Sequence, residues 1–149
     1  MMIYWVKQKK IKALYELYAK PVREKYGLTQ MEHSILMFLH RNPSHDTAAS
    51  IVSTGQFTKS HVSSAIKALE RRQLITGEYR NNNKKTVHLK LTELSDKIVQ
   101  DSLAAGKQYF DRLFTGFSKD ERQQMKHYFI KICENADAGL QDLQEKKDV

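Results

Sequence analysis

The segment from Thr58 to Thr92 constrains the fold most, because a short amphipathic stretch is followed directly by a basic, alternating one. Val62, Ala65, Ile66 and Leu69 recur at i, i+3, i+4 and i+7, which places all four on one face of a helix. Serine, lysine and arginine occupy the other positions. The spacing therefore predicts a helix with one buried face and one polar face.

The residues after this helix predict a β-hairpin. Val87, Leu89 and Leu91 alternate with polar residues, the pattern of a half-buried strand, and Leu74-Ile75 begins its partner strand. The asparagines at 81–83 tolerate the positive φ angles of a turn. A helix followed by a basic hairpin predicts a winged helix.

A second short helix is predicted upstream, from about Asp46 to Ser53. Gly55 ends it, and Thr58 is a plausible N-cap for the next helix. Helix, glycine turn and helix form the arrangement of a helix-turn-helix.

Positive charge is concentrated in the same region. Between Gln56 and Lys90 there are eight Lys or Arg residues against two acids, a net charge of +6 within a chain whose total is +8. Clustered basic residues on a recognition element favour contact with phosphates. The alternative for each residue alone is an ordinary solvated surface position.

The order of these elements resembles the MarR (multiple antibiotic resistance regulator) family, on the residues SHVSSAIKALERRQLI, a basic hairpin, and LKLTE opening a long helix. The resemblance covers nearly the whole chain. It implies a mainly α fold with a small β-hairpin wing and with N- and C-terminal dimerisation helices. Members of this family are transcription regulators, mostly repressors, that bind palindromic DNA as homodimers, and many respond to a small ligand. The resemblance implies the same function for this chain.

The resemblance places Ser60, Ser63, Ser64 and Lys67 at the family's recognition-helix positions. Arg80 is expected to contact phosphates together with Lys59 and Arg71, which position a protein on DNA without reading its sequence. The full set predicted to contact DNA is Thr58, Lys59, Ser60, His61, Ser63, Ser64, Lys67, Arg71, Arg80, Asn82, Lys84 and Lys85.

The chain departs from the family pattern at three places. The family's wing usually carries Asp-x-Arg, where this sequence has Asn83 and Lys85. The glycine before the first strand is Gln73, and the glycine early in the helix after Leu-Thr is Ser95. Lysine lacks the planar fork of arginine, so the wing's reach into the minor groove is expected to differ.

The rest of the chain is predicted to be helical. The whole chain, 1–149, is predicted to form a single winged-helix subunit. The DNA-binding lobe is expected at 29–91, and dimerisation helices at 1–26 and 92–144. Thr29 and Ser118 each begin a capping-box pattern, and Thr92 is expected to cap the long helix. The last helix carries an apolar stripe from Met125 to Leu143, which we expect to be covered by a second copy. The alternative is coverage by the first helix of the same subunit.

The sequence is compatible with three ways of sensing a signal: a small ligand, a redox change or a metal ion. Tyr15, Tyr18 and Phe38 could line a cleft for a small aromatic ligand, although aromatic residues at helical spacing are more often core. A redox sensor would use Cys133, which lies on the apolar stripe, where burial is the usual outcome. A metal sensor would use His33 and its neighbours, but metal-binding spacings are absent.

Composition limits the remaining classes. The sequence holds no catalytic or phosphate-loop motif, so an enzyme is not expected, and neither is a cofactor. No apolar run approaches the roughly 20 residues that span a bilayer, and no secretion signal is recognised. The one cysteine fits a reducing cytoplasm. A winged helix that binds protein rather than DNA remains an alternative, which the +6 segment disfavours.

Overall fold

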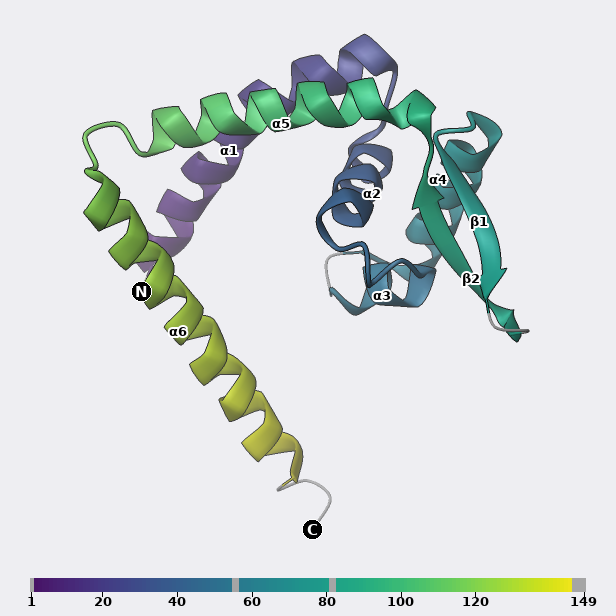
Figure 1. Ribbon diagram of the computed structural model, residues 1–149. Helices are drawn as coiled ribbons and strands as arrows, with labels where there is room; N and C mark the ends of the chain where they lie inside the picture. Colours follow the sequence, from purple (N-terminus) through teal and green to yellow (C-terminus); the bar gives the residue numbers. More distant parts are fainter. Residues whose placement is uncertain (1, 55–56, 81–82, 146–149) are drawn as a thin grey trace. The chain divides into compact units, whose positions relative to one another are not determined.

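The computed structural model describes the backbone of residues 2–54, 57–80 and 83–145 and the side chains of residues 8–54, 57–80 and 83–142. It contains six helices and one hairpin among these residues (Figure 1). In chain order they are α1 (Met2–Tyr26), α2 (Gln30–Arg41), α3 (Ala48–Ser53), α4 (Lys59–Arg71), β1 (Ile75–Arg80), β2 (Asn83–Leu91), α5 (Glu93–Leu113) and α6 (Lys119–Glu145).

One hydrophobic core joins α2, α3, α4 and the start of the hairpin. Its least exposed side chains are Ile35 and Leu36 of α2, Ile51 of α3, and Val62 and Leu69 of α4, all at 0–1% exposure. The apolar stripe predicted for the helix after Thr58 is therefore buried as expected. Burying such a side chain contributes about 1.5–3 kcal/mol, so this cluster holds the two helices of the helix-turn-helix together.

Helix α1 packs along α5. The Tyr109 ring of α5 meets the rings of Tyr15 and Tyr18 at centroid distances of 5.4 and 6.3 Å. At the end of α1, Lys25 Nζ and the Tyr26 hydroxyl both donate to Asp101 Oδ2 of α5, at 2.6 and 2.7 Å. The N-terminal helix therefore lies against the helix that follows the hairpin, a pairing that the sequence pattern had not predicted.

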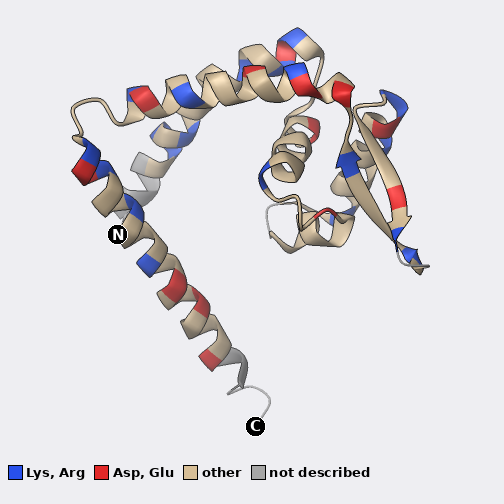
Figure 2. Cartoon of the chain, in the orientation of Figure 1, with Lys and Arg blue, Asp and Glu red and all other residues tan. Residues whose placement is uncertain are grey.

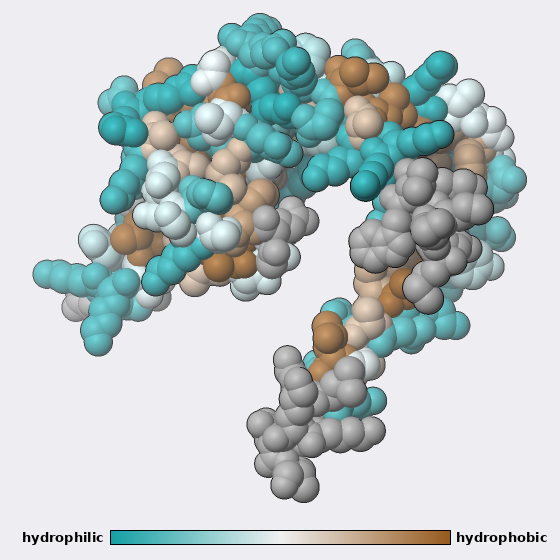
Figure 3. Space-filling view, turned by 180° about the vertical axis from the view of Figure 1, so that it is seen from behind, coloured by the Kyte–Doolittle hydropathy of each residue, from teal (hydrophilic) through white to brown (hydrophobic). Residues whose placement is uncertain are grey.

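The chain divides into two compact units, residues 1–110 and 111–149. The second unit contains α6, whose start is a capping box between Ser118 and Glu121, with N to O distances of 2.7 and 3.2 Å, as predicted. Apolar residues remain exposed along α6 (Figure 3), with Tyr128 at 59%, Phe129 at 67% and Ile132 at 64%. Among the described residues, no helix has the length and apolar character to cross a membrane.

Helix starts follow the sequence closely, with two differences. The capping box of Thr29 and Glu32 is present. Helix α3 begins at Ala48 with Thr47 as its N-cap, two residues later than predicted, because the Asp46 side chain is engaged elsewhere. Thr92 does not cap α5 as predicted. Its hydroxyl donates instead to the Gln73 carbonyl at 2.6 Å. The predicted turn at Gly55 lies outside the described residues.

Two departures from the family pattern have local explanations. Gln73 has φ +56°, the left-handed conformation that ends α4. Its N–H donates to the Glu70 carbonyl, and the next N–H, of Leu74, donates to the Leu69 carbonyl. This Schellman ending favours glycine, because a Cβ is disfavoured at positive φ. Gln73 adopts the same left-handed conformation although it has a Cβ. Ser95 is fully buried, and its hydroxyl donates to the Thr92 carbonyl at 2.7 Å.

Gly77 of β1 is required by close packing. A Cβ at this position would lie 2.7 Å from Val87 Cγ1 and 3.1 Å from Glu70 Oε1. We therefore expect Gly77→Ala to lower the free energy of unfolding by about 1 kcal/mol through overpacking. Gly106→Ala is the matched control. It lies in α5 with no atom near its Cβ, so it should raise the value by about 0.5–1 kcal/mol. Urea unfolding of both variants measures this, and equal effects would contradict it.

Candidate nucleic-acid interface

Helix α4 presents a polar face to solvent because its apolar face is held in the core. Val62, Ala65, Ile66 and Leu69 are buried, whereas every predicted contact residue on the helix is exposed. These exposed residues are Lys59, Ser60, His61, Ser63, Ser64, Lys67 and Arg71. Thr58 caps the helix by accepting the His61 N–H at 3.4 Å. The helix therefore offers hydroxyl groups and cations on one side.

The small side chains lie in the middle of that face and the cations towards its ends. Ser63 and Ser64 are flanked along the helix by Lys59 before them and by Lys67 and Arg71 after them. Figure 2 shows basic residues, in blue, on both α4 and the hairpin. A helix of this kind fits a major groove about 12 Å wide, because short hydroxyl side chains allow close approach and long cations reach phosphates or guanine acceptors. An open groove of about 700 Å³ borders Lys59 and Lys67 between α3, α4 and β2.

Near its turn, the hairpin presents two further lysines. Strands β1 and β2 pair in antiparallel fashion, with a register shift between Tyr79 and Arg80. At the start of β2, Asn83 Oδ1 accepts the N–H of Lys85 at 2.9 Å, which orders the chain beside the turn. Lys84 and Lys85 are exposed. Asn82, the other residue predicted at the wing tip, lies outside the described residues.

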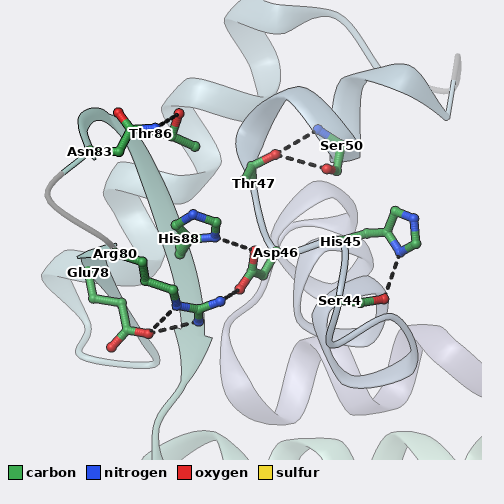
Figure 4. A network of polar contacts seen from close by, with 10 residues as sticks. All are labelled: Ser44, His45, Asp46, Thr47, Ser50, Glu78, Arg80, Asn83, Thr86 and His88. Carbon is green, nitrogen blue, oxygen red and sulfur yellow. Dashed lines mark hydrogen bonds and ion pairs between the residues drawn. The ribbon is translucent and has the colours of Figure 1, made fainter.

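Arg80 is already paired within the chain. Its Nη1 lies 2.8 Å from Asp46 Oδ2, and its Nη2 lies 2.8 Å from Glu78 Oε1 (Figure 4). His88 Nδ1 lies 2.7 Å from the other Asp46 oxygen. Arg80 is thus joined to two acids, unlike the exposed lysines of the hairpin, and its predicted phosphate contact has two internal competitors.

Sequence reasoning missed Asp46 and His88 as members of this cluster. Burial alone would raise the pKa of Asp46, but the hydrogen bond from His88 and the charge of Arg80 outweigh it and hold the pKa below its ordinary value of 3.8. Asp46 is therefore an ionised carboxylate at neutral pH. The only sequence signal was a lone acid before Thr47, a residue type common at helix starts.

The three aromatic residues predicted to line a ligand cleft are divided between two cavities. Tyr15 and Phe38 border an open cavity of about 670 Å³ between α1, α2 and the segment before α4. Tyr18 borders a separate enclosed space of about 10 Å³, which Tyr15 also lines. The larger cavity also borders Lys12, Arg41 and Glu16, so its wall combines aromatic rings with two cations and one acid.

The residues considered for sensing have ordinary surroundings. Cys133 is exposed on α6, which differs from the burial expected for it, because the apolar residues around it are uncovered in the single chain. His45 contacts the Ser44 hydroxyl at 3.1 Å. Within residues 8–54, 57–80 and 83–142, no three His, Cys, Asp or Glu side chains are placed to hold a metal ion.

His33 is buried at 4% exposure between α2 and α5. Its Nε2 lies 2.9 Å from the Ser102 hydroxyl oxygen. Ser102 itself donates to the Ile98 carbonyl at 2.7 Å, so the imidazole is the donor to Ser102. Burial, assisted by the charge of Arg23, lowers the pKa of His33 below its ordinary value of 6.5. The ring is therefore neutral at pH 7.

A helix-turn-helix whose second helix exposes a basic, hydroxyl-rich face, followed by a basic hairpin, defines a winged helix-turn-helix protein. Residues 26–81 match a family model described as the MarR family. This match covers the DNA-binding lobe, which therefore resembles the winged helix of the MarR transcriptional regulators.

Solved structures of MarR proteins share this fold. A MarR transcriptional regulator from Methanosarcina mazei Go1 is 18% identical, with a TM-score of 0.74 over 90% of this chain and 89% of that one. A putative MarR family regulator from Listeria monocytogenes complexed with 26mer DNA is 20% identical, with a TM-score of 0.69 over 83% and 81%. The S. aureus MepR–DNA complex is 20% identical, with a TM-score of 0.63 over 91% and 94%. No curated protein gives a significant match.

The buried histidine yields a prediction on stability. Because the pKa of His33 is lower in the folded chain, the unfolded chain binds more protons below pH 6.5, and the free energy of unfolding should fall as pH drops below that value. His33→Gln, which keeps a donor for Ser102, should lose less stability between pH 7 and pH 5 than the wild type. Urea unfolding at several pH values measures both. Parallel curves for the two proteins would contradict the prediction.

Proposed function

We propose that this protein binds a palindromic DNA operator as a homodimer, represses transcription from it and is released by a small aromatic ligand. The observation that carries DNA binding is the exposed polar face of α4, set between buried apolar residues and beside the lysines of the hairpin. Similar folds from Listeria monocytogenes and S. aureus were solved with DNA, which supports the proposal. Binding to an operator in this way also fits a cytoplasmic location.

Roles within the interface follow from chemistry. We assign base-edge contacts to Ser60, Ser63, Ser64 and Lys67, which lie on the solvent side of α4. Lys59 and Arg71 contact phosphates at the two ends of the helix. Lys84 and Lys85 contact phosphates from the hairpin. Base-edge contacts read the sequence, while phosphate contacts set position and supply most of the salt-dependent affinity.

The homodimer is supported by the apolar residues on α6. Tyr128, Phe129, Ile132 and Leu140 are 59–67% exposed, and these positions recur on one side of the helix. An exposed apolar stripe of this length on a soluble chain marks an interaction site. A second copy covers it with an equal stripe by two-fold symmetry. The dimer then sets two α4 helices about 34–36 Å apart, one turn of DNA.

The effector site is supported by the cavity beside Tyr15 and Phe38. Its volume of about 670 Å³ lies within the range of about 300–1,000 Å³ that is usual for small-molecule sites. The rings offer stacking surfaces, and Lys12 and Arg41 favour a ligand with a negative charge. The cavity borders both α1 and α2, so a ligand there contacts the dimerisation helix and the DNA-binding lobe together.

The test of function is selection of DNA by the purified protein from a random-sequence duplex library at moderate salt. An enriched palindrome with half-sites about one helical turn apart is the expected result. Lys67→Ala should change the preferred sequence, because Lys67 lies on the groove-facing side of α4. Binding without any enriched sequence would contradict the regulator proposal, and no binding to any duplex would favour a protein partner for the winged helix.

The hairpin lysines yield a separate prediction. Lys84→Ala with Lys85→Ala should weaken binding to all duplexes equally and reduce the slope of log affinity against log salt by about 0.9 for each lost phosphate contact. The matched control is Lys9→Ala with Lys10→Ala, which removes two adjacent exposed lysines from α1. Titrations of a fluorescent duplex at several salt concentrations measure both slopes. A wing variant indistinguishable from the α1 variant would remove the wing from the interface.

A further inference from the structure

Asp46 is a buried carboxylate whose side-chain partners both come from the hairpin. Its side chain is 7% exposed. It lies between α2 and α3, immediately before the Thr47 cap. Oδ1 accepts from His88 Nδ1 of β2 at 2.7 Å, and Oδ2 pairs with Arg80 Nη1 of β1 at 2.8 Å (Figure 4). A buried charge is costly unless it is paired and hydrogen-bonded, so the hairpin and this carboxylate constrain each other.

The main chain adds a third contact at the same place. The carbonyl oxygen of Asp46 accepts the N–H of Leu89 at 2.7 Å. One residue ahead of α3 therefore holds β2 by a backbone hydrogen bond and by His88, and holds β1 by Arg80. These contacts reach both strands of the hairpin from the helix-turn-helix.

The hairpin has few other attachments to the lobe. Ile75 is the one buried residue of β1, and Leu89 is the one buried residue of β2. A two-stranded hairpin is marginally stable alone in water. The core contact at Ile75 holds one end of the hairpin, and it does not by itself fix the orientation of the other end. Arg80 stands at that far end, next to the register shift after Tyr79, where strands bend and twist more.

We propose that Asp46 is a wing-positioning residue that sets where Lys84 and Lys85 are presented to DNA, and that Arg80 serves it as a partner instead of contacting a phosphate. This inference rests on the proposed DNA-binding function. It assigns to Asp46, Arg80 and His88 the fixing of the wing, in a chain whose wing has Asn83 and Lys85 in place of the family's Asp-x-Arg.

A positioning role and a purely electrostatic role of Asp46 predict opposite changes in DNA affinity for the same substitution. Asp46→Asn removes a negative charge from the DNA-binding lobe and frees Arg80, so charge alone would tighten DNA binding. If Asp46 positions the wing, the same change lowers the population in which the wing is correctly placed. The apparent dissociation constant then rises in proportion. Asn has nearly the same shape as Asp, which limits any effect on the fold.

The experiment measures duplex affinity and its salt dependence for the wild type, Asp46→Asn and Arg80→Gln. We expect each variant to bind about tenfold more weakly, the scale of a lost charged hydrogen bond, and the double variant to be little worse than either. Asp96→Asn, which removes a carboxylate from an exposed position on α5, is the matched control and should bind as the wild type does. Thermal unfolding confirms that each variant is folded at the binding temperature.

A second comparison tests position itself. In the wild type, replacing Lys84 and Lys85 by Ala should reduce affinity and salt slope. In the Asp46→Asn background the same pair of changes should cost much less, because the wing no longer delivers those lysines. Hydrogen exchange at the amides of 83–91 should be faster in Asp46→Asn, while exchange in α2 and α4 stays the same. Arg80→Gln, which alters a side chain 43% exposed, repeats this comparison if Asp46→Asn is poorly folded.

Three outcomes would overturn the inference. Equal or tighter DNA binding by Asp46→Asn would show that Asp46 only competes for Arg80. If the losses of DNA affinity caused by Asp46→Asn and by the two lysine changes were fully additive, Asp46 would act independently of Lys84 and Lys85. Unchanged hairpin exchange would show that the carboxylate does not hold the wing. If the wild type bound no duplex while exchange changed as expected, the DNA-binding proposal would fail, and with it the delivery of lysines to DNA.

Discussion

Burial of the apolar face of α4 is the interaction on which the rest of the structure depends. Val62 and Leu69 have no exposed surface, and truncating such a side chain typically costs about 2–5 kcal/mol. A helix held this firmly on one side has only one face left for solvent, so core packing decides which residues can meet DNA. The same packing fixes where α4 ends, and the Leu74 N–H bonded to the Leu69 carbonyl then directs the chain into β1.

Residues with a periodic or local signal were predictable from the sequence. The spacing of Val62 to Leu69, the capping boxes at Thr29 and Ser118, and the alternation around Leu89 each depend on neighbours within a few residues. The Asp46 cluster gave no such signal. Asp46 and His88 are 42 positions apart, and they meet only because the strand register and the packing of α3 bring them together. Local patterns do not contain that information.

The position of Gln73 shows how a local rule is satisfied by a different residue. The left-handed conformation at the end of α4 is required by the turn into β1, and a non-glycine residue there costs about 1–2 kcal/mol. The contacts around it compensate, since Thr92 donates its hydroxyl to the Gln73 carbonyl and leaves its predicted capping role. The acceptor is a main-chain carbonyl, so the position of Thr92 follows from the course of the backbone at this turn and not from the glutamine side chain.

Contacts at the end of α4 tie this helix to the end of α1, which is bonded in turn to α5. The Arg72 guanidinium donates to the carbonyls of Tyr26 and Gly27, at 2.6 and 3.0 Å, where α1 ends. Beside them, hydrogen bonds from Lys25, Tyr26 and Lys97 hold the pKa of Asp101 well below its ordinary range, so α5 presents a charged carboxylate to the end of α1.

These contacts give the proposed effector a physical route to DNA. The cavity beside Tyr15 and Phe38 is bordered by α1 and α2, and a ligand alters DNA affinity only by binding two arrangements of these helices unequally. A shift of α1 along α5 would move the Tyr26 and Gly27 carbonyls, to which Arg72 donates. Arg72 directly follows α4. The wing has a further attachment through Asp46, ahead of α3. On the proposed effector mechanism, a movement of α1 is passed to the end of α4 through Arg72, and from there to β1, which follows α4 directly.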